Sequence, residues 1–109
     1  MVQTINYADV LEQVLHAEST LQPALQPIAI SALCDRQAGR FMLVATGWEN
    51  KQRLDSIIFH ARLSEGKVII ETDKTEEGLT PTLVVAGIRE SDIIFAGLPA
   101  GHSAELIAA

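Results

Sequence analysis

The chain has 109 residues, of which 48% are hydrophobic and 20% are charged, and its formal net charge is −6 at pH 7. This length and composition predict one domain, residues 1–109, and exclude an intrinsically disordered chain. Fourteen acidic residues against eight basic ones disfavour direct nucleic-acid binding, which depends on Lys and Arg neutralising phosphates. The high apolar content leaves two explanations open: a well-filled core, or a surface covered by a partner or a second copy of the chain.

Targeting and redox features are few. Cys34 is the only cysteine, so no intrachain disulfide forms, and its apolar neighbours indicate a buried, inert thiol. Residues 1–6 have neither the basic region nor the apolar core of a signal peptide. No apolar run approaches the ~20 residues that span a membrane. We therefore expect no membrane contact and a cytoplasmic location.

The first element is a helix expected over residues 7–21. Asn6 is a suitable N-cap, and Asp9 lies in the first turn, where the helix dipole favours an acid. Pro23 ends the helix. Apolar residues at three- and four-residue spacing form one stripe, which consists of Val10, Leu11, Val14, Leu15, Ala17 and Leu21.

Four strands separated by polar turns follow, over residues 28–34, 40–48, 53–63 and 68–72. Residues 41–45 are apolar on both faces, which indicates a central strand. The third strand alternates, and the residues expected on one of its sides are Asp55, Ile57, Phe59, Ala61 and Leu63.

A tight turn at residues 64–67 sets the register between the third and fourth strands. With residues 65–66 as the loop, the expected core-facing pairs are Leu63–Val68, Ala61–Ile70 and Phe59–Thr72. On the opposite face His60 then lies across from Glu71, with Arg62 diagonal to the pair.

A second helix is expected between residues 75 and 86, capped by Asp73 or Thr75. Because Pro81 is comfortable only in a first turn, the firm helix is expected to begin at about Thr80. Its last turn leads into a glycine.

That residue, Gly87, fits the left-handed position after a helix, and residues 92–96 form a fifth strand. The order of elements is therefore α-β-β-β-β-α-β. Since sequential strands usually pair as neighbours, the predicted fold is α+β: one antiparallel meander of about five strands, with two helices packed on one face.

No residue pattern defines a catalytic, cofactor or metal site. The three histidines share no ligand spacing, and no glycine run opens a helix to cradle phosphate. Helix capping explains the acids near the second helix better than metal ligation does; these acids are Glu71, Asp73, Glu76 and Glu77. We expect no enzyme and no cofactor. A small enzyme in which Glu71 orients His60 as a base stays as an alternative.

Two sets of residues are candidates for contacts with a partner. The first set, a partner interface, is Trp48, His60, Arg62 and Glu71. Trp48 ends an apolar strand and is either a core-edge aromatic or an interface anchor. The second set, a basic edge at one end of the sheet, is Arg36, Arg40 and Lys67. A weak DNA-binding accessory role would use this basic edge.

Short segments in a fixed order carry a family resemblance over nearly the whole chain. They are Tyr7 with Leu11, Gly47–Trp48, His60, Gly66–Lys67–Val68, the group Asp73, Thr75, Glu76, Gly78, Leu79 and Leu83, then Gly87–Ile88 and Asp92–Ile93–Ile94. In order and spacing these segments resemble the XisI-like family, the fdxN element excision controlling factor proteins of cyanobacteria.

The resemblance implies a small accessory factor that accompanies a site-specific recombinase in removing a DNA element during cell differentiation. It also implies a protein partner, XisH-like and similar to restriction-type nucleases, and it carries over no catalytic residues. The chain departs from the family pattern at Ile69, where Trp is usual, and in residues 99–109, which lack Arg and aromatic residues. We expect a non-enzymatic partner of an XisH-like protein, with a homo-oligomer as an alternative assembly.

Overall fold

A computed structural model describes residues 5–21, 27–75 and 77–97. Pro23, Glu76 and residues 98–109 lie outside this described part. The elements are α1 (Tyr7–Ser19), β1 (Ile28–Asp35), β2 (Arg40–Glu49), β3 (Gln52–Ser64), β4 (Lys67–Asp73), α2 (Thr80–Val85), the 3₁₀ turn η1 (Glu90–Asp92) and β5 (Ile93–Phe95). This order confirms the predicted α+β class. No helix among the described residues has the length and apolar character needed to cross a membrane.

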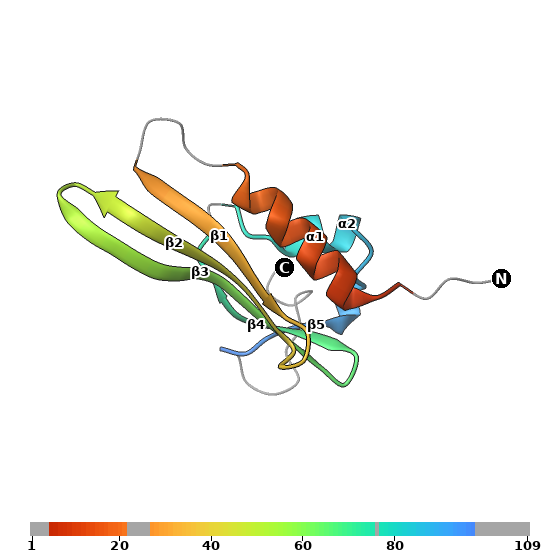
Figure 1. Ribbon diagram of the computed structural model, residues 1–109. Helices are drawn as coiled ribbons and strands as arrows, with labels where there is room; N and C mark the ends of the chain where they lie inside the picture. Colours follow the sequence, from red (N-terminus) through yellow and green to blue (C-terminus); the bar gives the residue numbers. More distant parts are fainter. Residues whose placement is uncertain (1–4, 22–26, 76, 98–109) are drawn as a thin grey trace.

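The five strands form one sheet in the order β1-β2-β3-β4-β5, and α1 and α2 lie on the same side of it (Figure 1). The first four strands pair antiparallel, as predicted. β5 pairs parallel to β4, so the antiparallel expectation was wrong for the last strand. The reason is the connection: α2 crosses over between the two strands, and a crossover returns the chain in the same direction.

The helix α1 begins as the sequence predicts. The Asn6 side-chain oxygen accepts hydrogen bonds from the backbone N–H groups of Ala8, at 2.9 Å, and Asp9, at 3.3 Å. These bonds satisfy donors that the first helical turn leaves free. The helix ends at Ser19, two residues before the predicted end at Leu21.

The core lies between the helices and the inner face of the sheet, which is the face turned toward α1 and α2. Its fully buried side chains come from both helices, from β2 to β5 and from the segment after α2. The largest are Phe41, Phe59, Leu11, Leu15, Leu43, Leu83, Ile88, Ile93 and Val68. One sheet face is therefore buried, while the other, which we call the outer face, is turned away from the helices.

Two β-bulges interrupt β3 and β4. Between β2 and β3, Leu43 pairs with Phe59 and Val44 pairs with Ile57, so Ile58 is an extra residue. The bulge changes which side chains face the core. The predicted alternation was therefore wrong at Asp55 and Ile57, which lie on the outer face. Ile57 has 42% of its surface exposed.

The second bulge lies between β3 and β4. The predicted pairs Leu63–Val68 and Ala61–Ile70 are confirmed. Beyond them Glu71 is the extra residue, so His60 pairs with Thr72, and Phe59 pairs with Asp73. The predicted pairs His60–Glu71 and Phe59–Thr72 were wrong because one inserted residue shifts every later pairing.

The helix α2 begins at Thr80 with Pro81 in its first turn, as predicted, but the predicted cap was wrong. The N-cap position is Leu79, without a side-chain cap. Asp73 instead orders the preceding loop: its carboxylate accepts from the backbone N–H of Thr75 at 3.0 Å and of Leu79 at 2.9 Å.

The end of α2 has the predicted left-handed glycine. Gly87 has φ 125° and donates its N–H to the Val84 carbonyl at 3.1 Å. Ile88 donates to the Leu83 carbonyl at 3.0 Å. These two bonds form a Schellman motif, in which the apolar residue after the glycine packs back onto the last turn.

Gly47 is a second position that requires glycine. Its φ is 146°, and a Cβ there would lie 2.0 Å from the Pro27 carbonyl oxygen. The approach is close because the Trp48 N–H donates to that same oxygen at 3.1 Å. Gly66, at the β3–β4 turn, also has positive φ, of 78°, but a Cβ there would meet no atom within 4 Å.

Alanine substitutions at Gly47 and Gly66 distinguish the cost of steric overlap from the cost of backbone strain. Gly66→Ala adds only the strain of a positive φ and should lower the free energy of unfolding by about 1 kcal/mol. Gly47→Ala adds a clash with the backbone and should lower it by about 3 kcal/mol or more. Urea unfolding of the two variants measures both values. Equal losses would show that the backbone contact at Gly47 relaxes freely.

Candidate functional site

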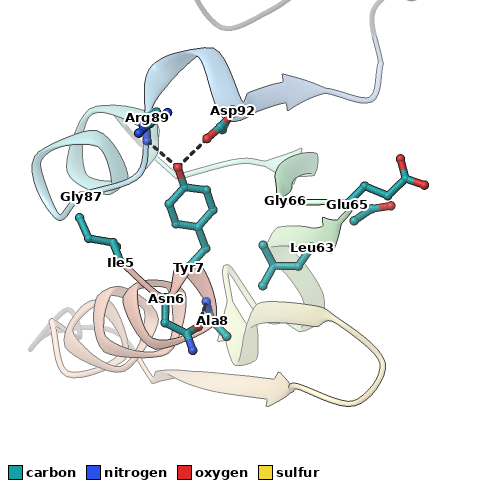
Figure 2. Close-up of a pocket in the computed structure, with 11 residues that line it drawn as sticks. Ile5, Asn6, Tyr7, Ala8, Leu63, Glu65, Gly66, Gly87, Arg89 and Asp92 are labelled. Atoms are coloured by element: carbon teal, nitrogen blue, oxygen red, sulfur yellow. Dashed lines mark hydrogen bonds between the residues drawn. The ribbon is translucent and has the colours of Figure 1, made fainter. Parts of the chain in front are cut away.

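A hollow of about 630 Å³ lies where the start of α1, the β3–β4 turn and the segment between α2 and η1 meet (Figure 2). Apolar side chains, chiefly Ile5, Ala8 and Leu63, form part of its wall. The rest of the lining consists of Asn6, Tyr7, Ser64, Glu65, Gly66, Gly87, Arg89 and Asp92. The lining is therefore mixed, with several polar groups beside an apolar wall. A concavity with convergent polar groups is a candidate binding site.

The polar part of the hollow is a hydrogen-bonded group centred on Tyr7. The Tyr7 hydroxyl donates to Asp92 Oδ2 at 2.6 Å and accepts from the backbone N–H of Arg89 at 3.3 Å (Figure 2). Asp92 Oδ1 accepts from Lys67 Nζ at 2.8 Å. These contacts connect α1, the start of β4 and η1, which are far apart in the sequence.

The charges in this group support one arrangement of protons. Partial burial, followed by the hydrogen bond to Asp92, raises the pKa of Tyr7 above its ordinary value. Hydrogen bonds from Lys67 and Tyr7 lower the pKa of Asp92. At neutral pH Tyr7 is therefore a protonated donor and Asp92 an ionised acceptor. Because each satisfies the other, neither is poised to take a proton from a substrate.

Arg89 differs from these residues because its guanidinium acts on Asp92 only through its charge, which helps to lower the pKa of Asp92. Its backbone N–H binds Tyr7, but within residues 5–21, 27–75 and 77–97 no hydrogen bond or ion pair engages its guanidinium. Guanidinium groups bind carboxylates and other acceptors well. The hollow can thus hold an apolar side chain against Ile5 and Leu63, with an acidic group at Arg89.

The sequence-predicted interface residues lie elsewhere, on the outer face. Arg62 Nε lies 2.5 Å from Glu71 Oε2, and His60 Nε2 lies 3.2 Å from Arg40 Nη1. Glu71 is thus the partner of Arg62 rather than of His60. Trp48 lies at the far end of β2, 54% exposed.

The basic edge predicted from Arg36, Arg40 and Lys67 is divided among different partners. Arg36 forms ion pairs with Asp9 and Glu12 of α1, the latter with Nε 2.7 Å from Oε1. Arg40 contacts His60 on the outer face, and Lys67 binds Asp92 beside the hollow. The three side chains therefore do not present one common cationic surface.

Sequence reasoning missed Tyr7, Arg89 and Asp92 as members of one site. Tyr7 is the only tyrosine, and it is separated from Asp92 by 85 positions. A weak signal existed, since both residues belong to the segments that carry the family resemblance. That signal does not say that the two side chains meet.

The Tyr7 hydroxyl provides a direct test of the hydrogen-bonded group. Because the folded-state pKa of Tyr7 is raised, its contribution to stability is present below the ordinary tyrosine pKa and is lost as pH rises through the raised value. Near-ultraviolet absorbance follows this single tyrosine. Asp92→Ala should bring its midpoint closer to the ordinary value. An unchanged midpoint would contradict a role for Asp92.

The pKa of His60 provides a second test, which concerns its contact with Arg40 on the outer face. Burial, and then the positive charge of Arg40, lowers the pKa of His60. The folded protein therefore loses stability as pH falls through the ordinary histidine range, where the unfolded chain takes up a proton more readily. Arg40→Met should raise the pKa of His60 and reduce that loss. Proton NMR titration measures the pKa, with His60→Gln identifying the resonance. An unchanged pKa would show that the charge of Arg40 does not act on His60.

Comparisons with known proteins place this fold among solved structures. The crystal structure of a XisI-like protein from Anabaena variabilis ATCC 29413 matches with a TM-score of 0.73 at 20% identity, over 86% of this chain and 85% of that one. The structure of the fdxN element excision controlling factor XisI from the same organism matches with a TM-score of 0.65 at 25% identity, over 92% and 93% of the two chains.

Two further comparisons concern the sequence alone. No curated protein matches the chain. The family model described as XisI protein matches residues 1–103, which include every residue of the hollow. The chain therefore belongs to the XisI protein family.

Proposed function

We propose that this protein is a non-enzymatic accessory factor for the excision of a DNA element and that it acts by binding an XisH-like protein. Membership of the XisI family supports this proposal. So does the similarity to a structure named as an fdxN element excision controlling factor, at 25% identity over 92% of this chain.

The observation that carries the proposal is the chemistry of the hollow. Tyr7 and Asp92 are held by each other and by Lys67, so this hydrogen-bonded group offers no free acid–base pair. The rest of the hollow includes an apolar wall, the Glu65 carboxylate and the guanidinium of Arg89. Among the described residues, no hydrogen bond or ion pair engages that guanidinium. These features suit the recognition of a partner segment with an apolar anchor next to an acidic group.

The charge of the chain is consistent with an indirect relation to DNA. The net charge is −6, and phosphate binding requires a cationic surface. Arg36 and Lys67 are both neutralised by carboxylates. In this proposal the partner makes the DNA contacts.

The enzyme alternative has less geometric support. His60 pairs with Thr72 across the strands, and Glu71 binds Arg62. Neither His60 nor Glu71 lines the 630 Å³ hollow. Among the described residues no carboxylate accepts a hydrogen bond from His60, so the orienting partner of a general base is not in place there.

Co-expression with the XisH-like protein encoded in the same genome tests the proposal. Size-exclusion chromatography should show the two proteins eluting together. Separate elution of the wild-type proteins would overturn the proposed partnership.

A matched pair of variants then tests whether the hollow makes the contact. Arg89→Ala removes the free guanidinium but keeps the backbone N–H that binds Tyr7, and it should weaken binding by about tenfold. Lys74→Ala removes an exposed cation outside the hollow and should leave affinity unchanged. Isothermal titration calorimetry gives both affinities. Wild-type affinity in Arg89→Ala would move the contact away from the hollow.

A further inference from the structure

We propose that residues 98–109 of this chain bind in the hollow and compete there with the partner. The docking itself involves only residues of this chain, whereas the competition rests on the proposed function. Three observations carry the inference: the interactions that the hollow leaves open, the composition of residues 98–109, and the length of chain that connects the two.

The hollow offers one cationic group beside apolar surface. Ile5 and Leu63 lie on either side of the Tyr7 ring (Figure 2), so apolar surface is available at two places. Arg89 lies next to the Tyr7 hydroxyl, to which its backbone N–H donates at 3.3 Å. Among the described residues, no hydrogen bond or ion pair engages the Arg89 guanidinium. An occupant that uses all of these features carries an acid and two apolar side chains.

The two carboxylates that line the hollow do not fill the place of that acid. Asp92 is engaged by Tyr7 and Lys67. Glu65 belongs to the β3–β4 turn, and its carboxylate points away from the Tyr7 ring (Figure 2). In the described part of the chain, neither carboxylate forms an ion pair with Arg89. An acid from another segment therefore reaches this guanidinium without breaking a bond of the fold.

Residues 98–109 have the composition that this site requires. Glu105 is their only acidic residue, and they contain neither Lys nor Arg. Leu106 and Ile107 follow Glu105 directly. A guanidinium and a carboxylate form strong, charge-assisted hydrogen bonds, and the apolar wall favours burial of apolar side chains. The segment thus carries an acid next to two apolar anchors.

The connecting chain is long enough to return to the hollow. Asp92 lines the hollow, and β5 then leads away from it, parallel to β4. An extended chain spans at most about 3.6 Å per residue, so Gly97, the last described residue, lies within about 18 Å of Asp92. The stretch from Gly97 to Glu105 spans up to about 29 Å. It contains Pro99 and Gly101, residue types that are common where a chain reverses its direction.

A segment of the same chain has an advantage over a separate molecule. Because it is tethered, its effective concentration at the hollow is in the millimolar range, as for other short flexible linkers. An exposed ion pair contributes little by itself, so the two apolar side chains supply most of the binding. The partner binds only those molecules in which the segment has left the hollow, and its apparent dissociation constant rises accordingly.

Paramagnetic relaxation enhancement in the full chain tests the docking without any partner. In a Cys34→Ser background, a nitroxide attached through Ser103→Cys should broaden the amide resonances of Leu63 and Gly87, which line the hollow. The resonance of Gln52, at the other end of β3, should keep its full intensity. Broadening that is absent at Leu63 and Gly87 overturns the proposal.

A mixed sample distinguishes a segment of the same molecule from that of a second copy. Chains with the nitroxide are mixed with isotope-labelled chains that lack it, so only contacts between molecules cause broadening. The intramolecular docking predicts full intensity at Leu63 in this mixture. Broadening as strong as in the singly labelled chain would assign the occupant to a second copy and overturn the proposal.

Substitutions test the individual contacts. Glu105→Gln removes the charge and should lower the ratio of docked to undocked segments about threefold, whereas the matched control Glu105→Asp keeps the charge and most of the broadening. Leu106→Ser should lower the ratio about tenfold. Arg89→Ala should act like Glu105→Gln, and the two together should cost no more than either alone, because they remove the same contact. Additive losses, or broadening that survives Leu106→Ser, overturn the proposed contacts.

Affinity for the XisH-like protein tests the competition. Leu106→Ser should increase the affinity by the factor by which it increases the fraction of molecules with an empty hollow. An unchanged affinity in this variant, with the broadening lost, overturns the competition. If neither the wild type nor Leu106→Ser binds the XisH-like protein, the proposed function fails, and the broadening at Leu63 and Gly87 still decides the docking.

Discussion

The structure depends on the burial of one face of a five-stranded sheet beneath two helices on the same side (Figure 1). Phe41, Leu43 and Phe59 from the sheet, with Leu11 and Leu83 from the helices, have at most 1% of their surface exposed. Burial of such side chains is the main favourable term in folding. Because the described core lies on the inner face, apolar side chains of the outer face such as Leu33 and Ile57 stay about half exposed.

The crossover through α2 determines where the hollow forms. It returns the chain to the edge of the sheet, so that Asp92 arrives beside Lys67 at the beginning of β4. Tyr7, at the start of α1, closes the same group from the other side. The hydrogen bonds that order this region engage the Asp92 carboxylate and the Tyr7 hydroxyl. In the proposed function this region holds a group of the partner in place.

The two bulges explain why the sequence predicted some neighbours correctly and others wrongly. The β3–β4 turn fixed the pairs next to it, including Leu63–Val68, because a short loop determines the local register. Beyond Ala61 an inserted Glu71 shifts the pairing, and this residue binds Arg62 instead of His60. Nothing in the alternation of side chains signals the insertion, since the energy that favours it comes from packing across the whole sheet.

The sequence by itself determined features that depend on near neighbours: the Asn6 cap, the apolar stripe of α1, the start of α2 at Thr80 and the glycine after it. It also sufficed for the α+β class and the family. Only the tertiary structure decided the direction of β5, the partners of the charged residues and the union of Tyr7 with Asp92. The physical reason is how far apart in the sequence the interacting residues lie. Caps and turns are set by bonds within a few residues, whereas strand direction and ion-pair choice depend on which distant segments the core brings together.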